Sequence, residues 1–340
     1  MIGLMRAELL RLRRRRSLQA ILLAVPLLVG VTFVLGYNSI YEQPPFDEGA
    51  FRQEMLDGGY GVGMPPEELD QLLDEAVKSQ REMFAQLDES QRFIRATYAF
   101  PYSLVQVLGS GTFVLLALIL LTATTIGDEF GWATIRTSLV ASSRRRRFLL
   151  VRLAAIVVAG LLIFGLLLVV GTLLPLLLDI PRSKLPATLP SFDGGAFLVL
   201  FVGELVASLL VIAFAALTTL LFRNGALALV AVPVWVAIEA AVLLLLLRFP
   251  NFGGPALSQV GDQPPPPPPD AWLLDAFPLR GFTTLVQTTG KAASGLPGYM
   301  GEVVGRDVAA AAVPITSFTI LSAILLVLAF RRFSRMDIVE

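Results

Sequence analysis

The chain has 340 residues, of which 55% are hydrophobic and 16% are charged, and its 27 basic and 27 acidic residues cancel. A soluble protein carries about 25% charged residues, so this composition indicates a membrane protein. The absence of cysteine excludes disulfides and thiol chemistry, and the absence of histidine excludes a His-based triad and the common type of zinc site.

Residues 1–17 predict an amphipathic helix that lies in the membrane interface. Ile2, Met5, Leu9 and Leu12 follow the spacing of one helical face, and the rest is largely arginine. Such a helix turns its basic side toward anionic headgroups, and the alternative is a positive flank that only fixes topology. We expect contacts with inner headgroups from the four consecutive arginines of this stretch, Arg13, Arg14, Arg15 and Arg16.

Residues 18–37 form the first of six apolar runs that are long enough to cross a bilayer as helices. About 20 residues at about 1.5 Å per residue span a hydrocarbon core of about 30 Å. A signal peptide is the competing interpretation of this run, but its length and the lack of an A-x-A pattern after it favour an uncleaved helix. The other predicted spans are 101–126, 148–178, 196–222, 225–247 and 308–330.

The acidic stretch 38–100 predicts an ordered helical segment on the outer side of the membrane. Pro65 and Pro66 followed by Glu67 and Glu68 are typical of a helix start, because acids favour the positive end of the helix dipole. The apolar stripe that follows argues against the alternative, a solvated acidic linker. The stripe consists of Leu69, Leu72, Leu73, Ala76, Val77, Gln80, Phe84 and Leu87.

A polar and basic segment, 127–147, separates the second and third runs. Gly127 and Gly131 interrupt the exit from the second run, and Asp128 and Glu129 lie between them. Four arginines lead into the third run, where we expect them to contact inner headgroups: Arg144, Arg145, Arg146 and Arg147.

The middle of this segment predicts a short helix parallel to the membrane surface. Trp132, Ile135 and Leu139 share one helical face, and Thr134 and Arg136 belong to a polar surface. The apolar stripe of such a helix can insert into a groove on a soluble protein. The alternative is a positive-inside loop with incidental helicity.

The rest of the chain alternates between outer connections and spans. A short loop, 179–195, precedes the fourth span, and a tight turn at Asn224 predicts that the fourth and fifth spans form an antiparallel hairpin. The second large outer segment, 248–307, contains six consecutive prolines at 264–269, which predict an extended polyproline stretch. Its partly apolar portion, 272–289, is expected on the outer interface, and the tail 331–340 is expected in the cytoplasm.

These features predict an all-α integral membrane protein with six transmembrane helices. The clusters of arginine fall on one side of the six spans, and basic residues remain cytoplasmic. Both termini are therefore expected in the cytoplasm, with an N-terminal interfacial helix and two large extracytoplasmic segments of helical content.

Glu204 and Glu239 are the only acidic residues inside the predicted spans. A carboxylate at this depth costs about 2.5–3.5 kcal/mol on insertion scales, so it usually faces a cavity or a partner. One interpretation places both acids on a substrate pathway, as sites for a cationic substrate or a proton relay. The other is a hydrogen bond between helices.

The order and spacing of these features resemble the ABC-2 type permeases, the membrane subunits of many bacterial ATP-driven exporters. The resemblance covers nearly the whole chain, from the N-terminal helix to the basic ending at 330–338. The family pattern of an acid, a glycine, a threonine and a basic run is filled here by Glu129, Gly131, Thr134 and Arg147. Many members have short outer loops, whereas this chain has two long outer segments. The substrate of a family member therefore cannot be assigned to this chain.

The resemblance implies a permease subunit of an ATP-binding cassette exporter, which moves an amphiphilic or hydrophobic substrate such as a drug, antibiotic or lipid across the bacterial plasma membrane. Two permease chains, identical or different, and two cytoplasmic ATPase subunits would form the working unit. Segment 127–147 would be the coupling helix, with contacts to the ATPase from Asp128, Glu129, Gly131, Trp132, Thr134, Ile135, Arg136 and Leu139.

The chain lacks the P-loop pattern G-x-x-x-x-G-K-[ST], so ATP and Mg²⁺ are expected in the partner subunit. We expect no catalytic residue, metal or cofactor in this chain, and no nucleic-acid partner; its expected partners are the ATPase, a second permease and membrane lipids. Two alternatives remain, an ion-coupled secondary transporter and a non-transporting membrane scaffold or sensor.

Overall fold

The computed structural model describes residues 2–40, 45–60, 63–131, 145–180, 184–247, 275–294 and 308–335. Within these ranges every regular element is a helix and no strand occurs. Six of the helices are long and apolar enough to cross a membrane. The predicted all-helical class is therefore confirmed, and the six helices indicate a multi-pass membrane protein.

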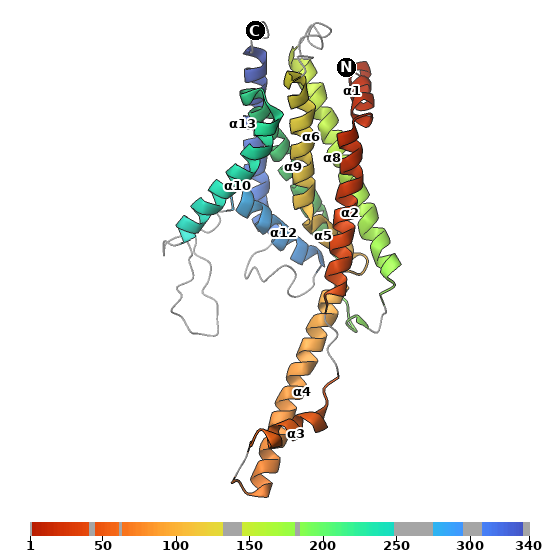
Figure 1. The fold of residues 1–340 in the computed structure, drawn as a ribbon, viewed down its shortest axis with the longest axis vertical. Coiled ribbons are helices and arrows are strands. Elements are labelled where there is room, and N and C mark those ends of the chain that lie inside the picture. The colour runs from red at the N-terminus through yellow and green to blue at the C-terminus, as the bar shows by residue number, and fades with distance from the viewer. Residues whose placement is uncertain are drawn as a thin grey trace.

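The six long apolar helices form an elongated bundle in which α9 takes the central place (Figure 1). Small residues on α9, such as Gly203 and Ala207, let neighbouring helices approach closely. A Cβ atom on Gly203 would collide with the side chain of Leu285, for example. The six helices are α2 (Arg16–Asn38), α6 (Gly111–Gly131), α8 (Arg145–Leu178), α9 (Gly194–Phe222), α10 (Gly225–Leu247) and α13 (Ala312–Arg335).

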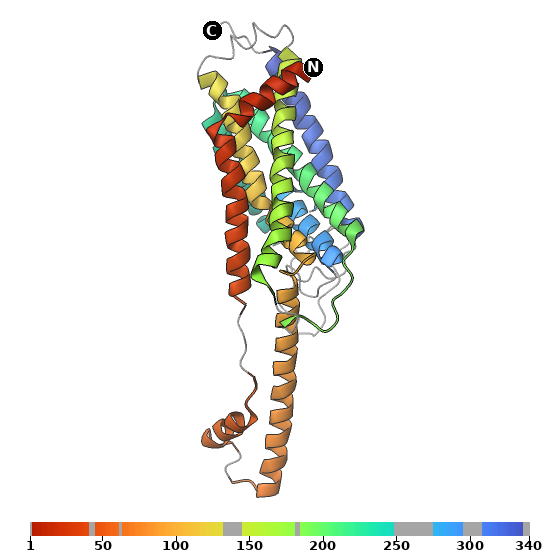
Figure 2. The ribbon, with the colours of Figure 1, turned by 90° about the vertical axis from the view of Figure 1, so that its right-hand side faces the viewer.

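The N-terminal helix α1 (Ile2–Arg13) crosses the end of α8 obliquely (Figure 2). Leu12 is buried in the main hydrophobic core, and Met5 and Leu9 pack against that core. The apolar face of the predicted interfacial helix is thus turned in part onto the protein. The start of α1 and the end of α13 lie at this end of the bundle, which we call the termini end (Figure 1).

An arm of two helices projects from the opposite end of the bundle (Figures 1 and 2). It consists of α3 (Glu48–Asp57) and α4 (Pro66–Ala96), and α4 begins at the second proline of the predicted start signal. Arg52 pairs with Glu48 at 3.2 Å and also contacts Asp74, which joins the two helices. Because these pairs are exposed, each adds only about 0–1 kcal/mol to stability.

Tyr98 attaches the base of the arm to the bundle. Its ring makes edge contacts with Phe33 and Tyr37 of α2, at centroid distances of 4.8 and 5.8 Å. Gly36 makes room for the hydroxyl group, since a Cβ atom there would collide with it. Burial raises the pKa of the Tyr98 hydroxyl above its ordinary value, so this side chain is neutral at physiological pH.

The structure divides the predicted span 101–126 into a short helix, α5 (Tyr102–Gly109), and α6, with a break at Ser110. Glycine and serine favour non-helical conformations, so the Gly109-Ser110-Gly111 sequence explains the break. The helix that follows Gly111 continues to Gly131, beyond the predicted boundary at 126.

A second internal helix, α12 (Pro278–Ser294), lies within the bundle and packs mainly on α9. The sequence placed this segment on the outer interface. Its polar residues can be buried because they bond to their own helix, as when the Thr288 hydroxyl donates to the Thr284 carbonyl at 2.7 Å. A 3₁₀ turn, η3 (Val308–Ala311), packs against both α12 and α13.

Candidate functional site

Helix α6 ends and helix α8 begins at the termini end, on either side of the segment predicted to couple to a soluble partner (Figure 1). Asp128 and Glu129 lie in the last turns of α6, and Gly131 is its final residue. The side chain of Glu129 is outside the described residues. The same holds for the other predicted coupling positions, Trp132, Thr134, Ile135, Arg136 and Leu139.

Asp128 is held by an arginine of its own chain. Nη1 of Arg15 lies 3.3 Å from Oδ2 of Asp128 and donates to the Thr124 carbonyl at 3.1 Å. A cation near the C-terminal end of a helix also interacts favourably with the helix dipole. The Asp128 side chain is still 54% exposed. It therefore remains accessible to a second protein while it ties the α1–α2 junction to α6.

The predicted headgroup arginines fall into two groups. Arg15 is partly buried through its contact with α6, whereas the others that the structure describes have exposed side chains. Arg144 and the side chain of Arg145 lie outside the described residues. The exposed members are Arg13, Arg14, Arg16, Arg146 and Arg147.

A buried cation at this end was missed by the sequence analysis. Arg152 of α8 is 2% exposed, and its Nη2 lies 3.8 Å from Oε1 of Glu8 on α1. Its guanidinium carbon lies 4.6 Å from the ring centroid of Phe148, and Phe148 stacks on Phe333 of α13. We call Glu8, Phe148, Arg152 and Phe333 the Arg152 cluster. It joins α1, α8 and α13. Glu8 is the lone acid of the basic stretch 1–17, and it was the one sequence feature that could have indicated this ion pair.

The backbones of α6 and α10 touch near the same end. A Cβ atom on Gly127 would lie 2.5 Å from the Cα atom of Gly225, and one on Gly225 would lie 2.5 Å from the Ala123 carbonyl oxygen. The sequence predicted that Gly127 interrupts the end of the second run. In the structure α6 continues past Gly127, and this glycine allows a close helix contact.

Glu204 is fully buried on α9, between helices of the bundle. Its carboxylate packs against Gly111, the first residue of α6, where a Cβ atom would collide with both oxygens. Neither oxygen has a hydrogen-bond partner among the residues that the structure describes, and the same is true of the Ser208 hydroxyl one turn further along α9. An acid in this position offers two acceptor atoms to a donor or cation that enters the bundle.

Glu239 is buried on α10, but its carboxylate has a partner. It accepts a hydrogen bond from the backbone N–H group of Leu279 in the first turn of α12. The N–H groups of a first turn lack partners within their own helix, and a carboxylate there also favours the helix dipole. The geometry thus supports the interpretation of Glu239 as a link between helices.

Replacing Glu239 with alanine is expected to lower the free energy of unfolding by about 0.5–2 kcal/mol, the usual cost of losing a helix N-terminal cap. Glutamine keeps an acceptor oxygen, so Glu239→Gln should lose less. Denaturant unfolding of the two variants in micelles measures the difference. Equal losses in both variants would contradict the capping role.

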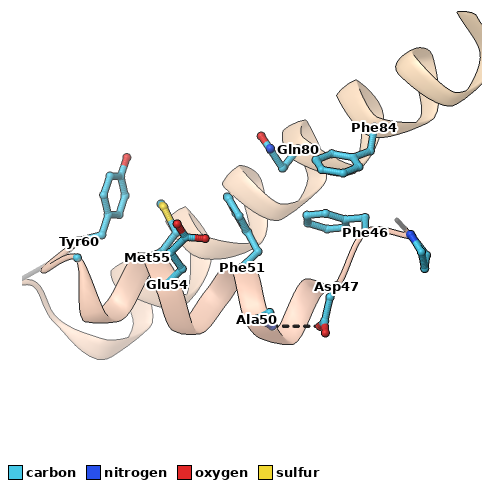
Figure 3. Close-up of a pocket in the computed structure, with 11 residues that line it drawn as sticks. Phe46, Asp47, Ala50, Phe51, Glu54, Met55, Tyr60, Gln80 and Phe84 are labelled. Carbon is cyan, nitrogen blue, oxygen red and sulfur yellow. Dashed lines mark hydrogen bonds between the residues drawn. The ribbon is translucent and has the colours of Figure 1, made fainter. Parts of the chain in front are cut away.

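The arm carries an open groove of about 790 Å³ between α3 and α4. Figure 3 shows Phe46 facing Phe84 of α4, with ring centroids 5.1 Å apart, and the ring of Phe51 in α3 lies 5.7 Å from that of Phe46. Asp47 accepts a hydrogen bond from the Ala50 N–H at 3.0 Å and so caps α3. The groove is lined mostly by apolar side chains that hold the two helices together.

Across the described ranges, no group of three or more acidic side chains is close enough to hold a metal ion. Comparison with known proteins adds no relative: no family model matches the chain, and neither a curated protein nor a solved structure matches it.

Proposed function

We propose that this chain is the membrane permease subunit of an ATP-driven exporter of the ABC-2 type. The observation that supports this most is the joint emergence of α6 and α8 at the termini end, where α6 is tied to the α1–α2 junction and α8 is tied to α1. Arg15 contacts Asp128 on α6, and Arg152 of α8 contacts Glu8 on α1. A soluble partner that moved segment 127–147 would therefore move three helices together.

The distribution of arginine supports a cytoplasmic location for the termini end. Exposed arginines gather there on α1, α8 and the end of α13, and lysine and arginine in short loops remain on the cytoplasmic side. The resemblance implies that the bundle lies in the bacterial plasma membrane. On this assignment the α3–α4 arm lies outside the cell.

Motion of the coupling segment would reach the interior of the bundle through tightly packed contacts. Gly127 meets Gly225 backbone to backbone, so α10 follows the end of α6. Helix α9 packs against both α6 and α10 as well as against α13. These contacts support a mechanism in which nucleotide-driven movement of a separate ATPase rearranges the spans around an amphiphilic or hydrophobic substrate.

Glu204 favours a second candidate function, an ion-coupled secondary transporter. A fully buried carboxylate that has no donor among the described residues is the type of group that binds a cation or proton in such proteins. The two candidates differ in their energy source. ATP-dependent transport that requires a second subunit supports the permease, whereas transport by the isolated chain driven by an ion gradient supports the alternative.

The coupling role is tested with the full chain and any ABC-type ATPase that proves to be encoded beside its gene. We expect the two proteins to co-purify, and we expect Trp132→Ala to weaken their binding about 30-fold, as the loss of about 2 kcal/mol from an aromatic anchor implies. Asp128→Arg should lower transport per ATP hydrolysed, with Asp70→Arg on the distant arm as the matched control. Normal binding and normal transport in both inner variants would refute the proposal.

A further inference from the structure

A groove of about 600 Å³ lies between α1 and α8 at the termini end. Its walls are apolar: Leu9 and Leu10 of α1 face Leu150 and Val151 of α8, and Ala154 extends the groove along α8. Leu10 and Leu150 are exposed, so the groove is open to whatever surrounds the helices.

Two arginines, Arg6 and Arg13, also line this groove. They are seven residues apart and so lie on the same side of α1, about 10 Å from each other along its axis. Among the described residues, neither guanidinium group forms an ion pair, whereas Arg11 and Arg15 each contact a carboxylate. The long apolar stems of Arg6 and Arg13 can cover the groove while their charged ends reach the surface.

A third exposed arginine lies on the same side of α8. Arg147 precedes Leu150 by three residues and Ala154 by seven, so helical spacing places it one turn nearer the termini end than the groove. Three exposed arginines therefore lie along or next to the apolar walls. This arrangement matches a molecule with a long apolar chain and a negatively charged head.

We propose that the α1–α8 groove binds an anionic phospholipid of the inner leaflet. One acyl chain would lie along Leu150 and Ala154, and the phosphate would bind between Arg6 and Arg13. Arginine forms paired hydrogen bonds with phosphate oxygens, and basic pockets between membrane helices at the cytoplasmic side bind anionic headgroups. A zwitterionic lipid offers the same tails but has a positive group that these arginines repel.

The lipid would act as a further link between α1 and α8. Glu8 already contacts Arg152, and Arg15 joins the same part of the chain to α6. A bound phospholipid would fill the gap that these contacts leave on the opposite side of α1. This inference goes beyond the proposed transport function, and it is tested by binding alone.

The test uses the purified full chain in detergent micelles, with lipid binding measured by native mass spectrometry. Phosphatidylglycerol should bind in preference to phosphatidylcholine of the same chain length. At about 1 kcal/mol per arginine, the double variant Arg6→Gln, Arg13→Gln should bind phosphatidylglycerol about 30-fold more weakly. Ala154→Phe, which fills the groove without a change in charge, should also weaken binding.

The matched control is Arg331→Gln with Arg332→Gln, which removes the same charge from exposed positions on α13. This variant should bind the lipid like the wild type. The proposal fails if the control loses as much affinity as the groove variant, or if phosphatidylcholine binds equally well. It also fails if inorganic phosphate competes as effectively as phosphatidylglycerol, because the apolar walls would then contribute nothing.

Discussion

Replacing Arg152 with alanine is expected to lower the free energy of unfolding by about 3–5 kcal/mol, the typical effect of removing one partner from a buried ion pair. Arg152 is 2% exposed, and the nearly buried Glu8 would lose this buried cation and keep the more exposed Arg11 as its ion-pair partner. The variant also loses the contact of the guanidinium group with the Phe148 ring. Reversible denaturant unfolding in micelles measures the change.

Two further variants separate the ion pair from general effects of removing an arginine. Arg146→Ala changes an exposed residue of the same helix and should alter stability by no more than about 0.5 kcal/mol. The double variant Glu8→Leu, Arg152→Met removes both charges and should recover much of the loss, because no buried charge is left alone. If Arg152→Ala behaves like Arg146→Ala, the cluster does not hold α1 to the bundle.

Glu204→Leu is expected to raise the free energy of unfolding by about 1–3 kcal/mol, the usual penalty for a buried polar group without a hydrogen bond. Neither carboxylate oxygen of Glu204 has a donor among the described residues, and leucine has a similar volume. The same unfolding assay applies. A loss of stability would show that the acid has a partner that stabilises the fold.

Glu239→Leu provides a control of opposite sign. This acid is also buried in a span, but it accepts a hydrogen bond from Leu279 in the first turn of α12, so its loss should destabilise the protein. Transport by Glu204→Leu then distinguishes the two interpretations of the acid. A variant that is more stable but transports less identifies Glu204 as part of the pathway, since functional sites often trade stability for activity. Unchanged transport removes it from the pathway.

The long helices could be predicted from the sequence because insertion into a membrane depends on local composition. Helix α9 starts within two residues of its predicted position and ends at the predicted Phe222, and α10 matches the predicted run 225–247. The start of α4 at Pro66 was marked by two prolines and two acids, which act within one helical turn. In each case the signal and the structure involve neighbouring residues.

The short internal helices and the ion pairs could not be predicted in this way. Helix α12 contains threonines and glycines, so its burial depends on the neighbours that surround it rather than on its own composition. Glu8 and Arg152 come from opposite ends of the N-terminal half of the chain, and no local pattern links them. Of the predicted coupling residues, the structure gives side-chain contacts for Asp128, and the role of the segment stays a prediction.

The attachment of the α3–α4 arm has a mechanical consequence. Helix α4 has 31 residues, which corresponds to a rod of about 46 Å, and it is fixed at its base where Tyr98 fits between Phe33 and Tyr37. A sideways push at the far end of such a rod produces a large torque at the fulcrum and only a small displacement there. Whatever touches the tip of α4 would therefore strain the end of α2 without moving it far.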